Sequence, residues 1–122
     1  MKRQKVEAKG FLPLTPAMFH VMLALVDGEK HGYAILKEVS RSTNGRVQLS
    51  VGTLYGIIKR LDNDGMIIES AERPDPGLDD ERRRYYRLSD FGREVAVAEA
   101  ERMEEVIAMA RAKKLLRRPQ PA

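Results

Sequence analysis

The segment SVGTLYGIIKRLDNDG, residues 50–65, combines a phenol and cations with several very small side chains. Tyr55 and Lys59 are four residues apart, so they share one face of a helix, and Gly52 and Gly56 follow the same spacing beside them. Phenol and ammonium groups bind phosphate oxygens, and small side chains let a backbone approach another surface closely. These residue types favour a helix whose N-terminal half lies in the major groove of double-stranded DNA. The predicted contact residues are Ser50, Gly52, Thr53, Tyr55, Lys59 and Arg60.

The opposite side of this helix is apolar, which is why the polar residues should face outward. Four aliphatic residues recur at the spacing i, i+3, i+4, i+7 of one buried helix face, namely Leu54, Ile57, Ile58 and Leu61. Ser50 is the expected N-cap, and Gly65 is the expected stop. An outward tyrosine and lysine are common on any solvated helix, so this helix alone is weak support for DNA contact.

A second cationic cluster follows in the segment ERRRYYR, residues 81–87. Arg82, Arg83 and Arg84, with Arg87 nearby, form the densest positive patch outside the two ends of the chain. Acidic residues at 79–81 could neutralise this patch locally, but they lie on the loop side and the arginines on the strand side. A hairpin would therefore present the arginines to DNA phosphates or to a minor groove.

The remaining pattern predicts the elements that must position these residues. Residues 14–28 and 31–45 are expected to form two helices, the first capped by Thr15 with Pro16 in its first turn and largely buried. The link RVQLS, residues 46–50, is expected to be a short strand. Residues 66–72 and 82–88 have strand character and flank a charged loop that contains two prolines, which predicts a hairpin. The fold class is therefore mainly α with a small β-hairpin, in the arrangement of a winged helix-turn-helix.

A last helix, capped by Ser89, should extend to about residue 113. This helix is long for so small a protein, and its apolar band is explained better by a partner helix than by contacts within the chain. The alternative is that the helix folds back on the core of its own chain. The predicted dimerisation residues are Val95, Ala98, Met103, Val106, Ile107 and Ala110. Two paired copies would reach half-sites about 34 Å apart on a palindromic site.

The distribution of charge supports a division of the chain into a central body and two basic ends. The net charge of +4 arises at the ends, since residues 1–9 carry four cations against one acid and residues 111–118 carry five cations, which leaves −4 for the body. We expect a basic flexible arm at 1–11, a DNA-binding domain at 12–88, a dimerisation helix at 89–116 and a disordered tail at 117–122. No apolar run is long enough for a signal peptide or a membrane span, which predicts a cytoplasmic protein.

Other chemistry finds little support in the sequence. The chain has no cysteine and two histidines, so a zinc site is not expected, and His31 is better placed to cap or pack against the second helix. Asp62 and Asp64 are two residues apart and so face different sides of a helix, which disfavours paired acid–base catalysis. A phosphate-binding glycine loop and a nucleophile motif are also missing from the sequence. We therefore expect no enzyme, no cofactor and no metal.

Three segments in order carry a resemblance to a known family. His31-Gly32-Tyr33, Gly52-Thr53-Leu54-Tyr55 and residues 83–88 (RRYYRL), within roughly residues 12–112, resemble the PadR-like transcriptional regulators, in the short branch with one dimerising helix. The resemblance implies a homodimeric repressor that acts on its own or a neighbouring promoter.

The resemblance also implies that an apolar effector is a candidate partner, because some members bind planar or phenolic compounds at the dimer interface. The chain has no tryptophan to stack on such a compound. An adaptable pocket could be formed by Met18, Phe19, Met22, Met103 and Met109, although plain core or interface packing explains them better. The alternative function is a winged-helix protein-interaction module that uses the same faces on an acidic protein.

Overall fold

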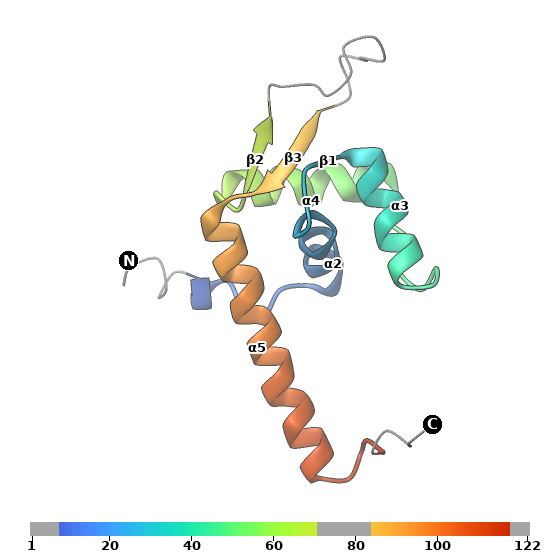
Figure 1. Ribbon diagram of the computed structural model, residues 1–122, viewed down its shortest axis with the longest axis vertical. Coiled ribbons are helices and arrows are strands. Elements are labelled where there is room, and N and C mark those ends of the chain that lie inside the picture. Colours follow the sequence, from blue (N-terminus) through green and yellow to red (C-terminus); the bar gives the residue numbers. More distant parts are fainter. Residues whose placement is uncertain (1–7, 71–83, 118–122) are drawn as a thin grey trace.

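Figure 1 shows the computed structural model of the chain, which describes residues 8–70 and 84–117. Its labelled elements are α2 (Pro16–Leu25), β1 (Lys30–His31), α3 (Gly32–Ser42), α4 (Val51–Asn63), β2 (Ile67–Ser70), β3 (Tyr85–Leu88) and α5 (Asp90–Ala112). Helices α2, α3 and α4 pack beside the sheet, and α5 runs out of this body. The fold class predicted from the sequence is confirmed, with a three-stranded antiparallel sheet in place of a plain hairpin.

The helix starts follow the predicted capping chemistry. The side chains of Thr15, Ser50 and Ser89 accept hydrogen bonds from the third residue beyond each of them, at 2.9–3.2 Å. His31 caps α3 in the same way, because its Nδ1 accepts from the amide of Ala34 at 3.1 Å, which confirms the capping role expected for it. Helix α2 ends at Leu25, earlier than the predicted stop at residue 28.

The third strand is not the one predicted. Residues 46–50 form no strand; instead Lys30–His31 is β1, which pairs antiparallel with β3 in the order β1-β3-β2. The backbone after α3 is held by Thr43, whose hydroxyl donates to the Val39 carbonyl at 2.8 Å and accepts from the Val47 amide at 3.0 Å. The residues after α3 therefore satisfy their backbone polar groups as a turn and not as a strand. The edge of β3 is paired instead by residues 30–31, although His31 was predicted to lie at the start of a helix.

The turn between α3 and α4 depends on left-handed backbone at Asn44 and Gly45, where the sequence predicted that the helix ends. Asn44 has φ of 54° and Gly45 has φ of 78°, and the Gly45 amide donates to the Ser40 carbonyl at 2.7 Å. Such positive φ values suit glycine and asparagine, which have the lowest cost in this region. The turn fixes the angle at which α4 crosses α3.

The core lies between α2, the sheet and the inner face of α4. Leu54, Ile58 and Leu61 are buried as the stripe predicts, and Ile57 is half-buried at its margin. Met22 and Leu25 from α2 are also buried in this core. Burial of one stripe fixes the rotation of α4, so its other faces are exposed.

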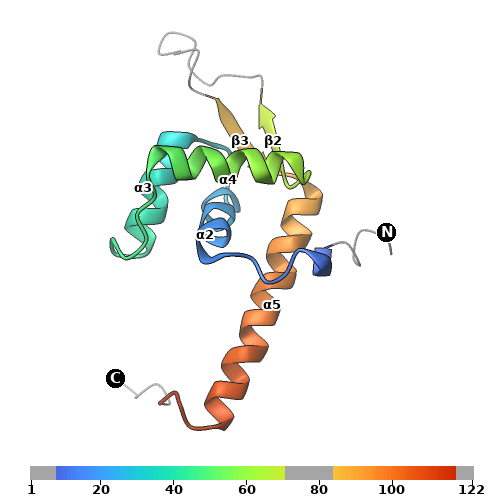
Figure 2. The same ribbon diagram turned by 180° about the vertical axis from the view of Figure 1, so that it is seen from behind.

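Helix α5 belongs to the body only in its first half. Val95 and Ala96 are buried in the core, whereas residues 103–109 are exposed as the helix runs away from the body (Figures 1 and 2). We call residues 103–112 the distal half of α5. Residues 8–11, predicted as part of a flexible arm, instead pack on α5: residues 8–10 are helical, Ala8 is buried, and the rings of Phe11 and Phe91 meet edge to face at 5.8 Å.

Ser89 joins α5 to the turn after α4. Its hydroxyl donates to the Gly65 carbonyl at 2.6 Å and accepts from the Gly92 amide at 2.9 Å. We expect Ser89→Ala to lower the free energy of unfolding by about 1–2 kcal/mol, because a helix cap and a second hydrogen bond are lost together. Urea unfolding followed by circular dichroism would measure this. The matched control is Ser42→Ala, at an exposed serine whose bond to the Val39 carbonyl is long at 3.4 Å, and it should change stability by less than about 0.5 kcal/mol.

Candidate nucleic-acid interface

The first turns of α4 form an exposed surface of small residues. Ser50 accepts from the Thr53 amide at 3.1 Å, and the two hydroxyls are 2.9 Å apart. Gly52 and Gly56 are exposed, and a Cβ built on either would have no neighbour within 4 Å. These glycines are therefore not required by packing inside the chain, and their absent side chains leave the helix backbone open to an approaching surface.

Tyr55 lies at the junction of this surface with α3. The side chain is 42% exposed, yet a Cβ placed on Gly32 would lie 2.6 Å from the Tyr55 hydroxyl oxygen. The phenol therefore rests over the start of α3 instead of pointing straight outward, as the helix phase alone had indicated. Gly32 therefore leaves room for the phenol over the start of α3, and a larger side chain at this position would displace the Tyr55 hydroxyl.

Lys59 and Arg60 are both exposed, one turn further along α4. The other side of the helix is held in the core by Ile58 and Leu61, so neither cation can turn inward. The helix therefore presents, in order, a capped first turn, small residues and two cations, which is a surface able to bind phosphate oxygens.

The wing is described only at its base. Arg82 and Arg83 lie outside the described residues. Arg84 is exposed directly before β3 and forms an ion pair with Glu69 on β2 at 3.2 Å. An exposed pair of this kind contributes little to stability, so Arg84 could exchange Glu69 for a phosphate at low cost.

One exposed side chain beside this surface, Val51, was not selected from the sequence, whereas Arg87 already belonged to the predicted cationic cluster. Val51 is 60% exposed in the first turn of α4, ahead of the buried stripe, where an apolar group suits a thymine methyl. Arg87 is exposed on β3, opposite Ile68 of β2. The signal for Val51 was an apolar residue directly after an N-cap, in phase with the stripe but one turn before its first buried residue, Leu54.

Tyr33 also faces outward near the start of α3. Its ring is 62% exposed, and the Lys37 ammonium lies 5.0 Å from the ring centroid. The sequence left open whether Tyr33 is core or surface, and the structure places it on the surface. An aromatic ring with a cation over it adds a second phenol and a second ammonium to the α3 side of the site.

The predicted dimerisation residues divide into three groups by their exposure. Val95 is fully buried within its own chain, so its assignment to a partner contact is wrong: it packs in the body's core, which α5 reaches in its first half. Ala98 and Ala110 are half-buried. Met103, Val106 and Ile107 are all more than 40% exposed on the distal half of α5, where they form an uncovered apolar face.

The residues suggested for an effector pocket do not meet. Met18, Phe19 and Met22 are buried in the core, whereas Met103 and Met109 are exposed on α5. Within residues 8–70 and 84–117, no cluster of three histidine or acidic side chains is arranged to hold a metal ion. No helix in the described part of the chain is long and apolar enough to cross a membrane.

A helix-turn-helix made by α3 and α4, followed by the β2–β3 wing, defines a winged-helix protein. Residues 21–98 match the transcriptional regulator PadR-like family, and the chain belongs to this family. It is therefore a transcriptional regulator and not an enzyme.

Two relatives and two solved structures give the extent of the similarity. The chain is 32% identical to transcriptional regulator Rv3488 of Mycobacterium tuberculosis over 87 residues, which cover 71% of this chain and 75% of that protein. It is 30% identical over 73 residues to an uncharacterised protein of Lysinibacillus sphaericus, across 60% of this chain and 64% of that one. The chain thus spans somewhat less than two thirds of the Lysinibacillus relative.

The solved structures share the fold at low identity. A transcriptional regulator from Clostridium thermocellum aligns with a TM-score of 0.66 at 21% identity, covering 88% of this chain and 93% of the other. Bacillus subtilis PadR in complex with operator DNA aligns with a TM-score of 0.58 at 17% identity, covering 89% of this chain and 52% of that protein.

Proposed function

We propose that this protein is a homodimeric repressor that binds a palindromic DNA operator through α4 and the arginine-rich wing. The observation that carries the proposal is the outer surface of α4, where Gly52 and Gly56 leave the backbone open and Lys59 and Arg60 are exposed. The similarity in fold to PadR bound to its operator supports it.

The direction of α4 suits entry into a major groove. A recognition helix contacts base edges with its N-terminal residues, and here that end carries Ser50, Thr53 and the exposed Val51. Hydroxyl groups accept from or donate to several bases, and an apolar group contacts the thymine methyl. Tyr55 and Lys59 then lie toward the phosphates that flank the groove, so base contact and positioning come from successive turns of one helix.

The charge distribution gives the second support. The body without its two basic ends has a net charge of −4, so the cations of α4 and β3 are local and not part of a general positive surface. Arg84 can exchange its exposed partner Glu69 for a phosphate, and Arg82 and Arg83 of the predicted wing extend the same segment. DNA would therefore be held by one face, in one orientation.

The distal half of α5 supports the homodimer. Met103, Val106 and Ile107 form an apolar face that residues 8–70 and 84–117 leave uncovered, and a second copy would bury it. Two-fold symmetry then places two copies of α4 on half-sites about 34 Å apart, which requires a palindromic operator. In this proposal residues 12–88 bind DNA, residues 89–116 dimerise, and the protein acts in the cytoplasm.

Fluorescence anisotropy on DNA from upstream of the protein's own gene, against a scrambled duplex and across a salt series, tests the proposal. We expect a preference of at least about a thousandfold that persists at physiological salt. Lys59→Ala should reduce the slope of log affinity against log salt by about 1, and Lys59→Glu should weaken binding at least about tenfold by repelling phosphate.

The control is Arg41→Glu, which makes the same charge change on an exposed α3 residue already paired with Glu38. It should have a much smaller effect than Lys59→Glu. Equal losses for the two variants would show non-specific attraction and contradict recognition by α4. Equal affinities for all duplexes, lost together as salt rises, would favour an interaction module whose basic ends bind any polyanion.

A further inference from the structure

The first two turns of α4 carry no side chain that can read a purine base by two hydrogen bonds. Arginine and lysine recognise guanine in this way, and asparagine and glutamine recognise adenine. Residues 50–58, all within the described part of the chain, include none of these four residue types. The first of them is Lys59, about 12 Å along the helix from Val51. Because a recognition helix contacts base edges with its N-terminal residues, base recognition by α4 must use other groups.

The hydroxyl groups of this segment have little capacity left for base recognition. Ser50 and Thr53 share one hydrogen bond at 2.9 Å, and the Ser50 oxygen also accepts from the Thr53 amide. Only one hydroxyl hydrogen of the pair is then free to donate. The Tyr55 hydroxyl is held over Gly32 at the start of α3. A single donor finds an acceptor on guanine, adenine and thymine alike, so it does not distinguish these bases.

Apolar groups are the remaining base-reading chemistry of the first turn. The Val51 side chain is 60% exposed, and Thr53 is also exposed and carries a methyl group. Successive helix residues are about 100° apart, so Val51 and Thr53 lie on either side of Gly52, where the backbone is open. Helix side chains lean toward the N-terminus, so those of the first turn extend past the end of the helix. This end of α4 therefore presents two apolar groups beside a bare backbone.

Thymine is the base that offers an apolar group to such a surface. Its C5-methyl group lies in the major groove, where the other three bases present hydrogen-bonding groups. We propose that Val51 and the methyl group of Thr53 recognise thymine C5-methyl groups in each half of the operator. The inference rests on the proposed DNA binding and adds the chemical group that is recognised. Discrimination against the other bases then comes from burial of methyl groups and not from paired hydrogen bonds.

Uracil in place of thymine tests the proposal, because it removes only the C5-methyl group. The probe is a duplex bound specifically in the anisotropy experiment, either from upstream of the protein's own gene or selected from a random pool. It is made once with thymine and once with uracil at every thymine position. We expect the uracil duplex to bind at least about tenfold more weakly, since a buried methyl group contributes about fourfold and each half-site supplies at least one. We call this ratio of dissociation constants the uracil effect.

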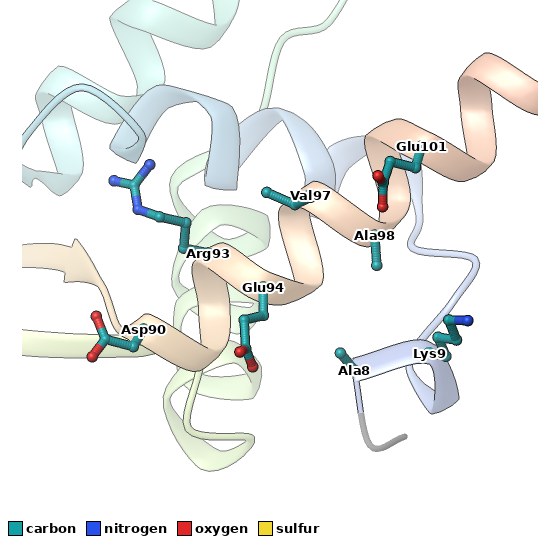
Figure 3. Close-up of a pocket in the computed structure, with 8 residues that line it drawn as sticks. All are labelled: Ala8, Lys9, Asp90, Arg93, Glu94, Val97, Ala98 and Glu101. Carbon is teal, nitrogen blue, oxygen red and sulfur yellow. The ribbon is translucent and has the colours of Figure 1, made fainter. Parts of the chain in front are cut away.

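The Val51→Ala variant connects the uracil effect to one side chain. It should bind the thymine duplex at least about threefold more weakly, and its uracil effect should be smaller by the same factor. Thr53→Ser removes the second methyl group, keeps the hydroxyl that bonds to Ser50, and should also reduce the uracil effect. The matched control is Val97→Ala, the same change at a 52% exposed valine on α5 (Figure 3), which should keep the full uracil effect.

The outcomes separate this inference from the proposed function. A specifically bound duplex with equal affinity in its thymine and uracil forms would overturn methyl recognition, while sequence-specific DNA binding stands. A uracil effect that stays as large in Val51→Ala and Thr53→Ser as in Val97→Ala would also overturn it, because the methyl groups would then act through other residues or through DNA shape. If neither the upstream DNA nor the random pool yields a specifically bound duplex, the proposed function is contradicted, and this inference with it.

Discussion

The Gly92→Ala variant is expected to lose at least about 3 kcal/mol of unfolding free energy, because the added methyl has no space. A Cβ on Gly92 would lie 1.9 Å from the Met66 carbonyl oxygen and 2.8 Å from its carbon. These are backbone atoms, and the same carbonyl accepts the Ser89 amide at 3.0 Å. Relief of the clash would break this bond and separate α5 from β2. Urea unfolding at matched protein concentration, followed by circular dichroism, measures the loss.

Gly56→Ala is the matched control, since it makes the same change inside a helix. A Cβ there meets nothing within 4 Å, so the variant should gain up to about 1 kcal/mol from the higher helix propensity of alanine. The two variants should therefore differ in sign. Similar stability for both would contradict the close contact between the start of α5 and Met66.

The Glu99→Ala variant is expected to lose about 2 kcal/mol, because it leaves the buried Leu14 amide without its acceptor and the partly exposed Arg102 guanidinium without its carboxylate. Glu99 is 2% exposed, accepts from the Leu14 amide at 2.9 Å and pairs with the Arg102 guanidinium through both carboxylate oxygens. Removing the carboxylate leaves the Leu14 amide without an acceptor inside the body. Glu104→Ala, on the exposed distal half, is the control and should change stability by less than about 0.5 kcal/mol at matched concentration. An equal loss at both positions would contradict a buried role for Glu99.

The pH dependence of stability isolates the charge of Glu99. The Arg102 guanidinium, assisted by the Leu14 amide, holds the pKa of Glu99 below its usual value of 4.5 although burial opposes this. The contribution is therefore fully present above pH 4.5, the value in the unfolded chain, and is lost as the pH falls through the lower pKa of the folded chain. Glu99→Gln should be less stable than the original protein at pH 7, and the difference should shrink below pH 4.5. A difference that is constant across this range would contradict an ionised Glu99.

Both residues determine how α5 leaves the body. Gly92 brings the start of the helix against Met66, and Glu99 ties its middle to the backbone just before α2. Two contacts separated by seven residues fix a direction as well as a position. The direction of α5 would in turn set the distance between two copies of α4 in the proposed dimer.

The local features of this protein could be predicted from its sequence. Side-chain caps at Thr15, Ser50 and Ser89 act on amides three residues away, and the stripe of α4 repeats within two turns. Such signals depend only on neighbours in the chain, so they predicted the helix starts and the outward face of α4. The family followed from three motifs that lie on these elements.

The contacts between distant segments could not be predicted from the sequence and follow from the packing of the fold. In the sequence, Glu99 is one of several acids on α5, but in the structure it accepts a hydrogen bond from the Leu14 amide, 85 residues earlier. In the same way, Val95 was predicted to contact a partner, but in the structure it is buried in the core of its own chain. The pairing of β1 with β3 and the contact of Tyr55 with Gly32 have the same origin. The local sequence pattern determines which face of a helix or strand is apolar. Which other segment packs on that face depends on the whole chain, because all segments compete to bury apolar side chains and to pair their backbone polar groups.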